Sequence, residues 1–244
     1  ELMLKNHPTT WKLFKTDTTG KALDGVTFSV KKYDLPEEEF GENKGQQDMT
    51  NAASEEKTVT TADGGSVELK YLTPGVYQVQ ETETLPGYIL DTEVRYVTVD
   101  KEGFIFESDP EGKPLDEDRA KSDTETLRWT NDFTKWDISK TDITGDEELE
   151  GAVLEVRNDK NELIETWISG KSPHRIERLI PGKYLLTEKT APAGYVTAST
   201  ISFEVTEDGK VHSVVMIDQV TRVRISKLDI TDQREVSGAH LEIL

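Results

Sequence analysis

An internal repeat constrains this chain more than any other sequence feature. Three segments align without gaps: WKLFKTDTTG from Trp11, WDISKTDITG from Trp136 and VRISKLDITD from Val223. A second pair is equally similar, with LTPGVYQVQETETLPGY beginning at Leu72 and LIPGKYLLTEKTAPAGY beginning at Leu179. Because self-similarity at intervals of this size is typical of arrays of one structural unit, we expect one fold to occur several times along the chain.

A third pair of segments marks the end of each repeat: LRWTNDF ends at Phe133 and VVMIDQV ends at Val220. These landmarks predict four parts, which are the closing strand of a preceding repeat over 1–8, whole repeats over 9–133 and 134–220, and the opening strands of a further, truncated repeat over 221–244. The first whole repeat is longer, and its extra residues fall near two acidic, loop-like inserts, YDLPEEEFGENKGQQDMTNAASEE and ESDPEGKPLDEDRAKSDTE.

The acidic balance and the absence of cysteine exclude several classes of function. The 244 residues carry a formal net charge of −19 and contain no cysteine. Nucleic acids and anionic membranes are bound through basic patches, so neither is an expected partner. Without cysteine, disulfides, thiolate nucleophiles and cysteine-ligated metals are excluded. No run approaches the roughly 18 apolar residues that span a membrane, so this segment is not expected to insert into one.

Short runs of β-branched and aromatic residues alternate with polar residues along both repeats. The runs VTFSV, YQVQE, ISFEV and SVVMI show this period of two, and DGG, TPG, EDG and PAG supply turns between such runs. Helices are expected to be short at most and confined to the first insert. Several short strands at this spacing predict an all-β protein made of tandem, Ig-like antiparallel β-sandwiches.

The same alternation brings polar residues into phase with apolar ones. Residues two apart on a strand share a face, so Lys140 shares a face with Trp136 and Ile138. Ionisable side chains are rarely buried without partners, so a set that recurs at matching positions needs a shared explanation. Each whole repeat has a lysine, a glutamate and an asparagine or aspartate in this phase: Lys15, Glu81 and Asn131 in the first, and Lys140, Glu188 and Asp218 in the second.

Physical chemistry leaves two interpretations of this set open. In the first, the three side chains lie at strand ends beside solvent and form ordinary ion pairs. In the second, burial lowers the pKa of the lysine and raises that of the glutamate, which leaves a nucleophilic amine facing a protonated carboxyl group. That glutamate would polarise the carbonyl of the third residue and carry a proton to the leaving group. The product would be an amide, with loss of ammonia at Asn131 and of water at Asp218.

The motifs resemble the Cna B-type (SpaA-like) repeats of Gram-positive surface adhesins and pilins, over nearly the whole chain apart from the inserts. The most specific element is the box L-x-P-G-x-Y-x-x-x-E-x-x-A-P-x-G-Y, which the second repeat matches throughout. The first repeat reads TETLPGY, with Leu85 where the family usually has alanine, a difference that is not expected to affect the chemistry. The resemblance implies a prealbumin-like β-sandwich.

The resemblance also assigns roles to the polar set. The bond-forming lysine of the family corresponds to Lys15 and Lys140, and its catalytic glutamate to Glu81 and Glu188. The acceptor corresponds to Asn131 and to Asp218; the family usually has asparagine there, and the aspartate resembles a known variant. Such an isopeptide bond would tie the first strand of each repeat to the last and restrict the unfolded chain by on the order of 4 kcal/mol.

These expectations predict an extracellular, cell-wall-anchored structural stalk rather than a turnover enzyme, since each repeat would react once, on itself. Neighbouring repeats are the expected partners. Two alternatives stay open: a host extracellular protein is bound through the inserts of the first whole repeat, or the chain is a polymerised pilin subunit. No cofactor or metal is expected, because His7, His174, His212 and His240 are scattered and the acidic loops lack a calcium-binding pattern.

Overall fold

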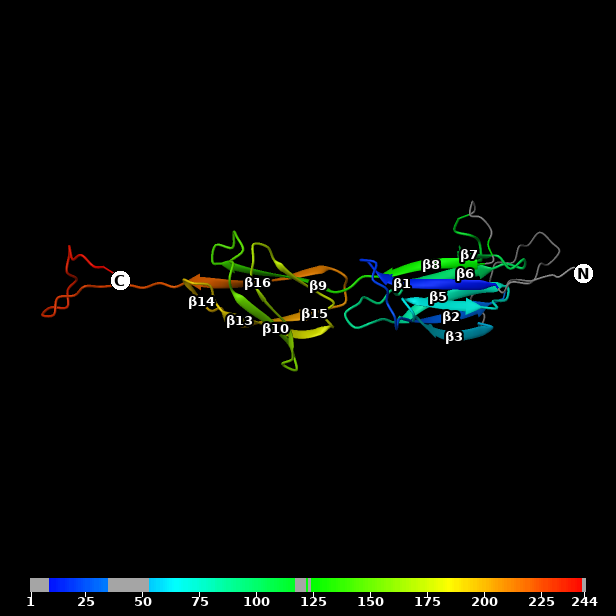
Figure 1. Ribbon diagram of the computed structural model, residues 1–244, viewed down its shortest axis with the longest axis horizontal. Coiled ribbons are helices and arrows are strands. Elements are labelled where there is room, and N and C mark those ends of the chain that lie inside the picture. The colour runs from blue at the N-terminus through cyan, green and yellow to red at the C-terminus, as the bar shows by residue number, and fades with distance from the viewer. Residues whose placement is uncertain (1–8, 35–52, 117–121, 123, 243–244) are drawn as a thin grey trace, which may run out of the picture. The chain divides into compact units, whose positions relative to one another are not determined.

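The computed structural model describes residues 9–34, 53–116, 122 and 124–242 (Figure 1). Within these residues it contains sixteen β-strands and no helix, which confirms the predicted all-β class. It follows that no helix in the described part of the chain is suited to crossing a membrane. The closing strand predicted over 1–8 lies outside the described residues, as do most of the first insert and part of the second.

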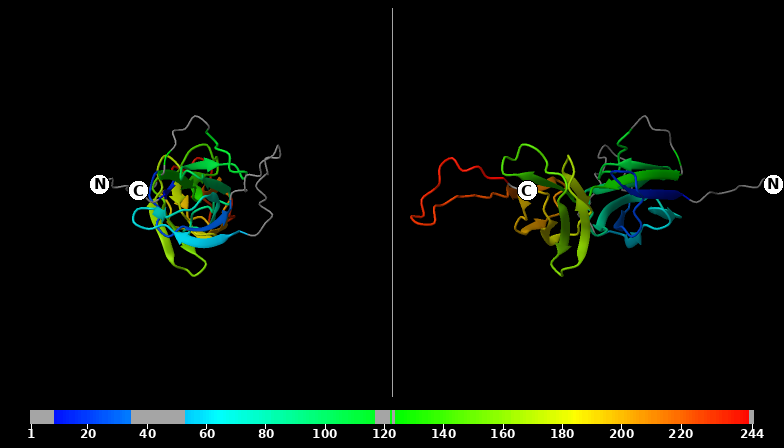
Figure 2. Two further views of the ribbon diagram at one scale, coloured as in Figure 1. Left: turned by 90° about the vertical axis from the view of Figure 1, so that its right-hand side faces the viewer. Right: turned by 60° about the vertical axis from the view of Figure 1, so that its left-hand side comes forward.

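The first repeat forms two sheets. One has the order β4 (Ser66–Lys70), β1 (Thr10–Asp17), β8 (Thr124–Asn131). The other has the order β3 (Glu55–Thr60), β2 (Thr27–Tyr33), β5 (Gly75–Glu83), β6 (Val94–Val99), β7 (Ile105–Ser108). The opening strand β1 and the closing strand β8 run parallel, side by side in Figures 1 and 2, with Lys15 opposite Trp129 and Asp17 opposite Asn131.

Alternation in the sequence explains these strands. Buried and less buried residues alternate through the whole of β1 and β8, as the period of two predicts. Trp129 packs its ring against Trp11 at 6.3 Å and against Phe28 at 5.8 Å, measured between ring centres. Burying side chains of this size contributes about 1.5–3 kcal/mol each, so the sandwich core holds β1, β2 and β8 together.

The second repeat also forms two sheets. One has the order β12 (His174–Glu177), β9 (Lys135–Asp142), β16 (Val211–Val220), β14 (Tyr195–Val196). The other has the order β11 (Leu163–Ile168), β10 (Val153–Asn158), β13 (Gly182–Thr190), β15 (Ile201–Val205). Leu154, Leu186 and Met216 are fully buried, so core residues come from both sheets.

By its contacts the chain divides into two compact units whose bounds cross the repeats. Unit 1 comprises Glu1–Asp137 together with Arg175–Lys183 and Glu204–Ser213, which belong by sequence to the second repeat. Unit 2 comprises Ile138–His174, Tyr184–Phe203 and Val214–Leu244. Two segments of the second repeat therefore have their principal neighbours in unit 1.

The opening strands expected after Val220 do not form in the described residues 221–242, where Leu228 and Glu235 make only an isolated bridge. In the first repeat the equivalent strand β1 lies between β4 and β8, whereas in the described part of the chain no strand pairs with residues 223–229. The turn of the repeat nevertheless forms, because it needs only its own residues. The Thr231 N–H donates to Asp229 Oδ1 at 2.7 Å.

Candidate crosslinking sites

The structure brings together the three polar residues predicted for the first repeat; we call them the first-repeat site. Lys15 from β1, Glu81 from β5 and Asn131 from β8 are 0%, 4% and 1% exposed. Lys15 Nζ lies 2.8 Å from Glu81 Oε2, and Asn131 Nδ2 donates a hydrogen bond of 2.6 Å to Glu81 Oε1. Glu81 therefore contacts both the amine and the side-chain amide with its two carboxylate oxygens.

Local sequence explains this convergence. Lys15 and Asn131 point to the same face because their strands are parallel and the register places Lys15 beside Trp129, two residues before Asn131. Glu81 is in phase with Tyr77 and Val79 on the buried face of β5, which belongs to the other sheet. The prediction that these residues face the core is confirmed by their burial.

Burial sets the electrostatics of the first-repeat site. Desolvation lowers the pKa of Lys15, and the close contact with the Glu81 carboxylate opposes part of that shift. Although Lys15 Nζ is within ion-pair distance of Glu81, neither it nor Asn131 Oδ1 has an aligned hydrogen-bond partner among the described residues. The arrangement is that of a buried amine whose proton has one nearby acceptor, the Glu81 carboxylate.

The residue at the alanine position of the family box is Thr84, and this corrects the expectation placed on Leu85. Tyr88 N donates to Leu85 O and Tyr195 N donates to Pro192 O, both at 3.1 Å, so Leu85 is equivalent to Pro192. The preceding residues, Thr84 and Ala191, are therefore equivalent. Asn131 Nδ2 donates a second hydrogen bond, of 2.8 Å, to Thr84 Oγ1. The difference between the repeats thus does touch the predicted acceptor.

Replacing Thr84 with alanine is expected to slow any reaction at Asn131 by roughly fivefold. The reason is that one neutral hydrogen bond contributes about 1 kcal/mol, and Thr84 helps to orient the side-chain amide. The measurement is the loss of ammonia from the first repeat, followed by mass spectrometry after cell-free synthesis. Loss of water from the second repeat of the same molecules is the internal control. An unchanged rate would show that Thr84 does not position the acceptor.

The second repeat brings its three predicted residues together in unit 2; we call them the second-repeat site. Lys140 from β9, Glu188 from β13 and Asp218 from β16 are buried. Lys140 Nζ contacts Asp218 Oδ1 directly and lies 3.3 Å from Glu188 Oε1. Glu188 Oε2 accepts a hydrogen bond of 2.6 Å from the Ala198 N–H, which fixes the carboxyl group.

The two sites differ in formal charge. With every group ionised, the first-repeat site is neutral, whereas the second-repeat site holds one cation and two carboxylates. The second-repeat site therefore places two carboxyl groups beside a single ammonium group. A protonated Asp218 is the form of an aspartate that can condense with an amine.

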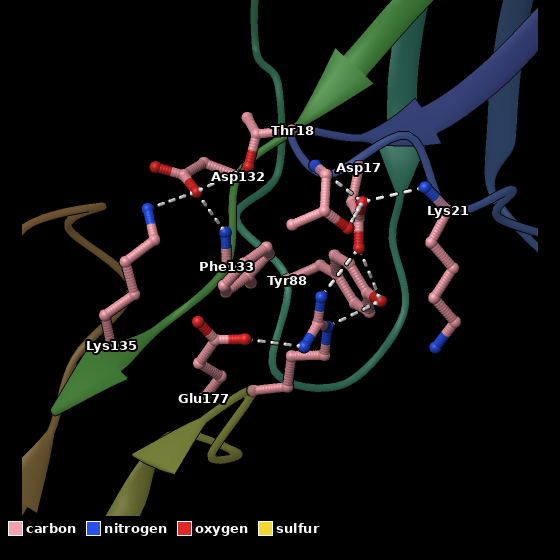
Figure 3. A network of polar contacts seen from close by, with 10 residues as sticks. Asp17, Thr18, Lys21, Tyr88, Asp132, Phe133, Lys135 and Glu177 are labelled. Atoms are coloured by element: carbon pink, nitrogen blue, oxygen red, sulfur yellow. Dashed lines mark hydrogen bonds and ion pairs between the residues drawn. The ribbon is translucent and has the colours of Figure 1, made fainter. Parts of the chain in front are cut away.

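A network around Asp17 was not predicted from the sequence (Figure 3). Arg178, which lies in unit 1, donates from Nη2 to Asp17 Oδ2 at 2.8 Å and from Nε to the Tyr88 hydroxyl at 3.0 Å. Its guanidinium carbon lies 4.0 Å from the centre of the Phe133 ring. Asp17 is two residues after Lys15 and therefore in phase with the core, which is the signal that would have identified it.

The network controls the ionisation of Asp17. Burial alone would raise the pKa of Asp17, but hydrogen bonds from Thr19, Arg178 and the backbone of Lys21 outweigh burial and hold the pKa far below its ordinary value. Asp17 is opposite Asn131 in the register, so the network lies beside the acceptor end of β8.

Acid is expected to weaken unit 1 through Asp17. Since its pKa is depressed on folding, the carboxylate contributes stability above its unfolded pKa of about 3.9, and this contribution is lost as the pH falls below that value. Asp17→Asn should cost about 1–3 kcal/mol at pH 7 and leave a smaller decrease in stability between pH 5 and pH 2.5. Thermal unfolding across this range tests the prediction. Equal pH dependence in the variant and the parent would contradict it.

The other sequence candidates do not converge. His174 contacts Glu165 and stacks on Trp167, whereas His212 contacts Asp208 and stacks on Trp136. Within the described ranges, no group of three or more histidine, aspartate and glutamate side chains has the geometry of a metal site.

Fold and site define a class of protein: tandem two-sheet sandwiches, each with a lysine, a glutamate and an asparagine or aspartate buried together. Residues 9–113 and 134–220 match the model of the SpaA family, described as a prealbumin-like fold domain. The chain belongs to this family, which confirms the resemblance seen in the motifs.

Solved structures that resemble this chain include a fragment of a pilus adhesin. The C-terminal fragment of the pilus adhesin SpaC from Lactobacillus rhamnosus GG has a TM-score of 0.50 and 18% identity, covering 90% of this chain and 100% of the fragment. Its iodide-soaked form has a TM-score of 0.52 and 17% identity, covering 89% and 100%. The Bacillus anthracis TIE protein has a TM-score of 0.43 and 24% identity over 87% of this chain, which spans 34% of that protein. No curated protein matches.

Proposed function

We propose that the chain is a structural spacer of a Gram-positive surface protein and that each repeat closes one intramolecular isopeptide bond. One observation carries this proposal: both repeats bury a lysine against a glutamate at equivalent positions. The acceptor side chain contacts the glutamate in the first repeat and the lysine in the second. Ordinary ion pairs at solvent-exposed strand ends do not account for this burial, because all six side chains are at most 4% exposed.

In the first repeat the reaction joins Lys15 Nζ to the side-chain carbonyl carbon of Asn131. Glu81 takes a proton from the Lys15 ammonium group, which frees the lone pair for attack. Glu81 then gives this proton to Asn131 Nδ2, which it contacts at 2.6 Å, and takes another from the attacking nitrogen. The Cγ–Nδ2 bond breaks, one ammonia leaves for each amide formed, and Glu81 ends protonated.

In the second repeat the amide forms between Lys140 and Asp218, and the leaving group is water. Glu188 takes a proton from the Lys140 ammonium group, and the amine attacks the carboxyl carbon of protonated Asp218. Glu188 donates its proton to the hydroxyl group, the C–OH bond breaks, and water leaves. Glu188 then takes another proton from the attacking nitrogen. Fixed neighbours make both condensations accessible, since effective molarities in oriented sites reach about 10⁵ M or more.

A crosslink at these positions makes the repeat a mechanical unit. It joins the first strand to the last, so a pulling force that enters at β1 or β9 leaves at β8 or β16 through covalent bonds. Each site reacts once and consumes itself, which is the behaviour of a structural element and not of a turnover enzyme. The pilus adhesin SpaC shares the fold, which supports an extracellular, wall-associated location for this chain.

Peptide mapping tests the proposal site by site. After trypsin digestion, the segment around Lys15 should remain joined to the segment around Asn131, and Lys140 should remain joined to Asp218. Fragmentation of each branched peptide should place the linkage on these residues. Recovery of ordinary linear peptides that contain unmodified Lys15 and Lys140 would refute the crosslinks and leave buried ion pairs in their place.

A further inference from the structure

The network around Arg178 defines a socket that holds a guanidinium group. Besides its side-chain bonds to Asp17 and Tyr88, Arg178 donates from its backbone N–H to Thr134 O at 2.9 Å. Thr134 Oγ1 in turn donates to Leu179 O at 2.7 Å. The arginine has a left-handed backbone, with φ of 63°, directly before the Leu-x-Pro-Gly motif. The socket therefore binds both a side chain and the turn that presents it.

The second repeat has the same socket residues in unit 2. Thr134 N donates to Gly87 O at 3.0 Å and Thr221 N donates to Gly194 O at 2.8 Å, so Tyr195 and Thr221 correspond to Tyr88 and Thr134. Asp142 corresponds to Asp17, since each accepts a hydrogen bond from the N–H of the threonine two residues later, at 2.8 Å in one case and 2.9 Å in the other.

These second-repeat residues surround an open space. Asp142 and Tyr195 line a cavity of about 340 Å³ together with the acidic residues Asp146, Glu147 and Glu148. Among the described residues, no lysine, arginine or histidine forms an ion pair with Asp142, whereas its counterpart Asp17 pairs with Arg178. We call this cavity the Asp142 socket.

Charge favours a cation here more strongly than in the first repeat. The isolated bridges Thr16–Ala22 and Thr141–Glu148 show that Ala22 and Glu148 occupy equivalent positions. The residue before this position is Lys21 in the first repeat and Glu147 in the second. A positive side chain is thus replaced by a negative one at the rim. Val220 stands where Phe133 supplies a ring to Arg178, so the attraction comes from charge and hydrogen bonds rather than from a cation–π contact.

We propose that the Asp142 socket binds an arginine side chain presented on a left-handed turn by another module of this fold. Arginine fits better than lysine because two donors of one planar group must reach a carboxylate and a tyrosine hydroxyl at once. The arginine comes from a neighbouring module of the same polypeptide, just as Arg178 of the second repeat binds Asp17 of the first, and a second copy of the chain is the alternative outcome of the test. The first repeat does not supply it, since the residue at the presenting position is Tyr71, with φ of 60°.

Binding of a short peptide to the whole chain tests this proposal. The probe copies residues 177–182, which contain Arg178 and the Leu-x-Pro-Gly motif. Titration followed by amide chemical shifts should give a saturable change at Asp142, Thr144 and Tyr195. Asp142→Asn keeps the turn-forming side chain and should weaken binding at least about tenfold, as should lysine in place of arginine in the peptide. Tyr195→Phe removes only the hydroxyl group, so it is a second variant that should weaken peptide binding while the fold stays intact.

Matched variants separate this inference from the crosslinks. Glu188→Gln removes the proposed bond of the second repeat and should leave peptide binding unchanged. Arg178→Ala empties the first socket and should raise the number of peptides bound per chain from one to two. Concentration-dependent dimerisation that is abolished by both Asp142→Asn and Arg178→Ala would identify a second copy as the source. Equal binding by the parent and Asp142→Asn, or no saturable binding, would overturn the proposal.

Discussion

A single molecule pulled from its two ends is expected to show no unfolding step from residues 15–131 or from residues 140–218. If the first repeat opened, the chain between Lys15 and Asn131 would lengthen by roughly 400 Å, at about 3.5 Å per residue. The proposed crosslink would prevent this because the force would pass from Lys15 to Asn131 through covalent bonds. Residues 132–139, which connect the two sites, stay in the path of the load, as do the residues before Lys15 and after Asp218.

The matched control is Lys15→Arg, which keeps a positive charge but cannot form the amide. This variant should show a step of roughly 400 Å from the first repeat, while the second repeat stays unextended. Lys140→Arg should give the reverse pattern. A step of that length in the chain without substitutions would contradict the proposed path of force, even if other methods detected the crosslinks.

Glutamine in place of the proposed catalytic glutamate is expected to leave each repeat folded and unlinked. Glu81→Gln nearly keeps the shape of the side chain, but an amide does not take a proton from Lys15 and return it to Asn131. The variant loses a covalent loop of about 100 residues, which is worth on the order of 4–5 kcal/mol in the chain-entropy model. Its melting temperature should fall, and proteases should cut the first repeat faster because local opening is no longer limited.

The second repeat of the same molecule provides the control, since Glu188 is unchanged there and Lys140 should still join Asp218. The reciprocal variant, Glu188→Gln, should lose only the second bond. The ion-pair interpretation predicts otherwise, because Lys140 and Asp218 would stay paired in Glu188→Gln with no covalent change to detect. If Glu81→Gln still releases ammonia from the first repeat at the parental rate, Glu81 is not the proton carrier.

The fold class and the two polar sets follow from the sequence because strand side chains alternate with a period of two. That rule placed Lys15, Glu81 and Asn131 on core-facing positions, and their burial agrees with it. The same rule applies to Asp17, which was nevertheless not singled out from the sequence. Its partner Arg178 is distant in the chain and reaches Asp17 from a left-handed turn, which alternation does not describe.

Two other features escaped prediction for different reasons. Counting back from the shared Gly-Tyr pairs Thr84 with Ala191, and the backbone hydrogen bonds agree, but the contact of Thr84 with Asn131 depends on side-chain positions that the sequence does not give. The expected strands after Val220 fail because a strand needs neighbours. The turn at Asp229, which needs none, forms as it does at Asp17 and Asp142.

The intact mass of the purified protein tests the central claim most directly. The two sites predict a mass below that of the sequence by one ammonia, lost at Asn131, and one water, lost at Asp218. Lys15→Arg should lack only the loss of ammonia, and Lys140→Arg only the loss of water. An intact mass equal to that of the unmodified sequence would contradict the account for both repeats.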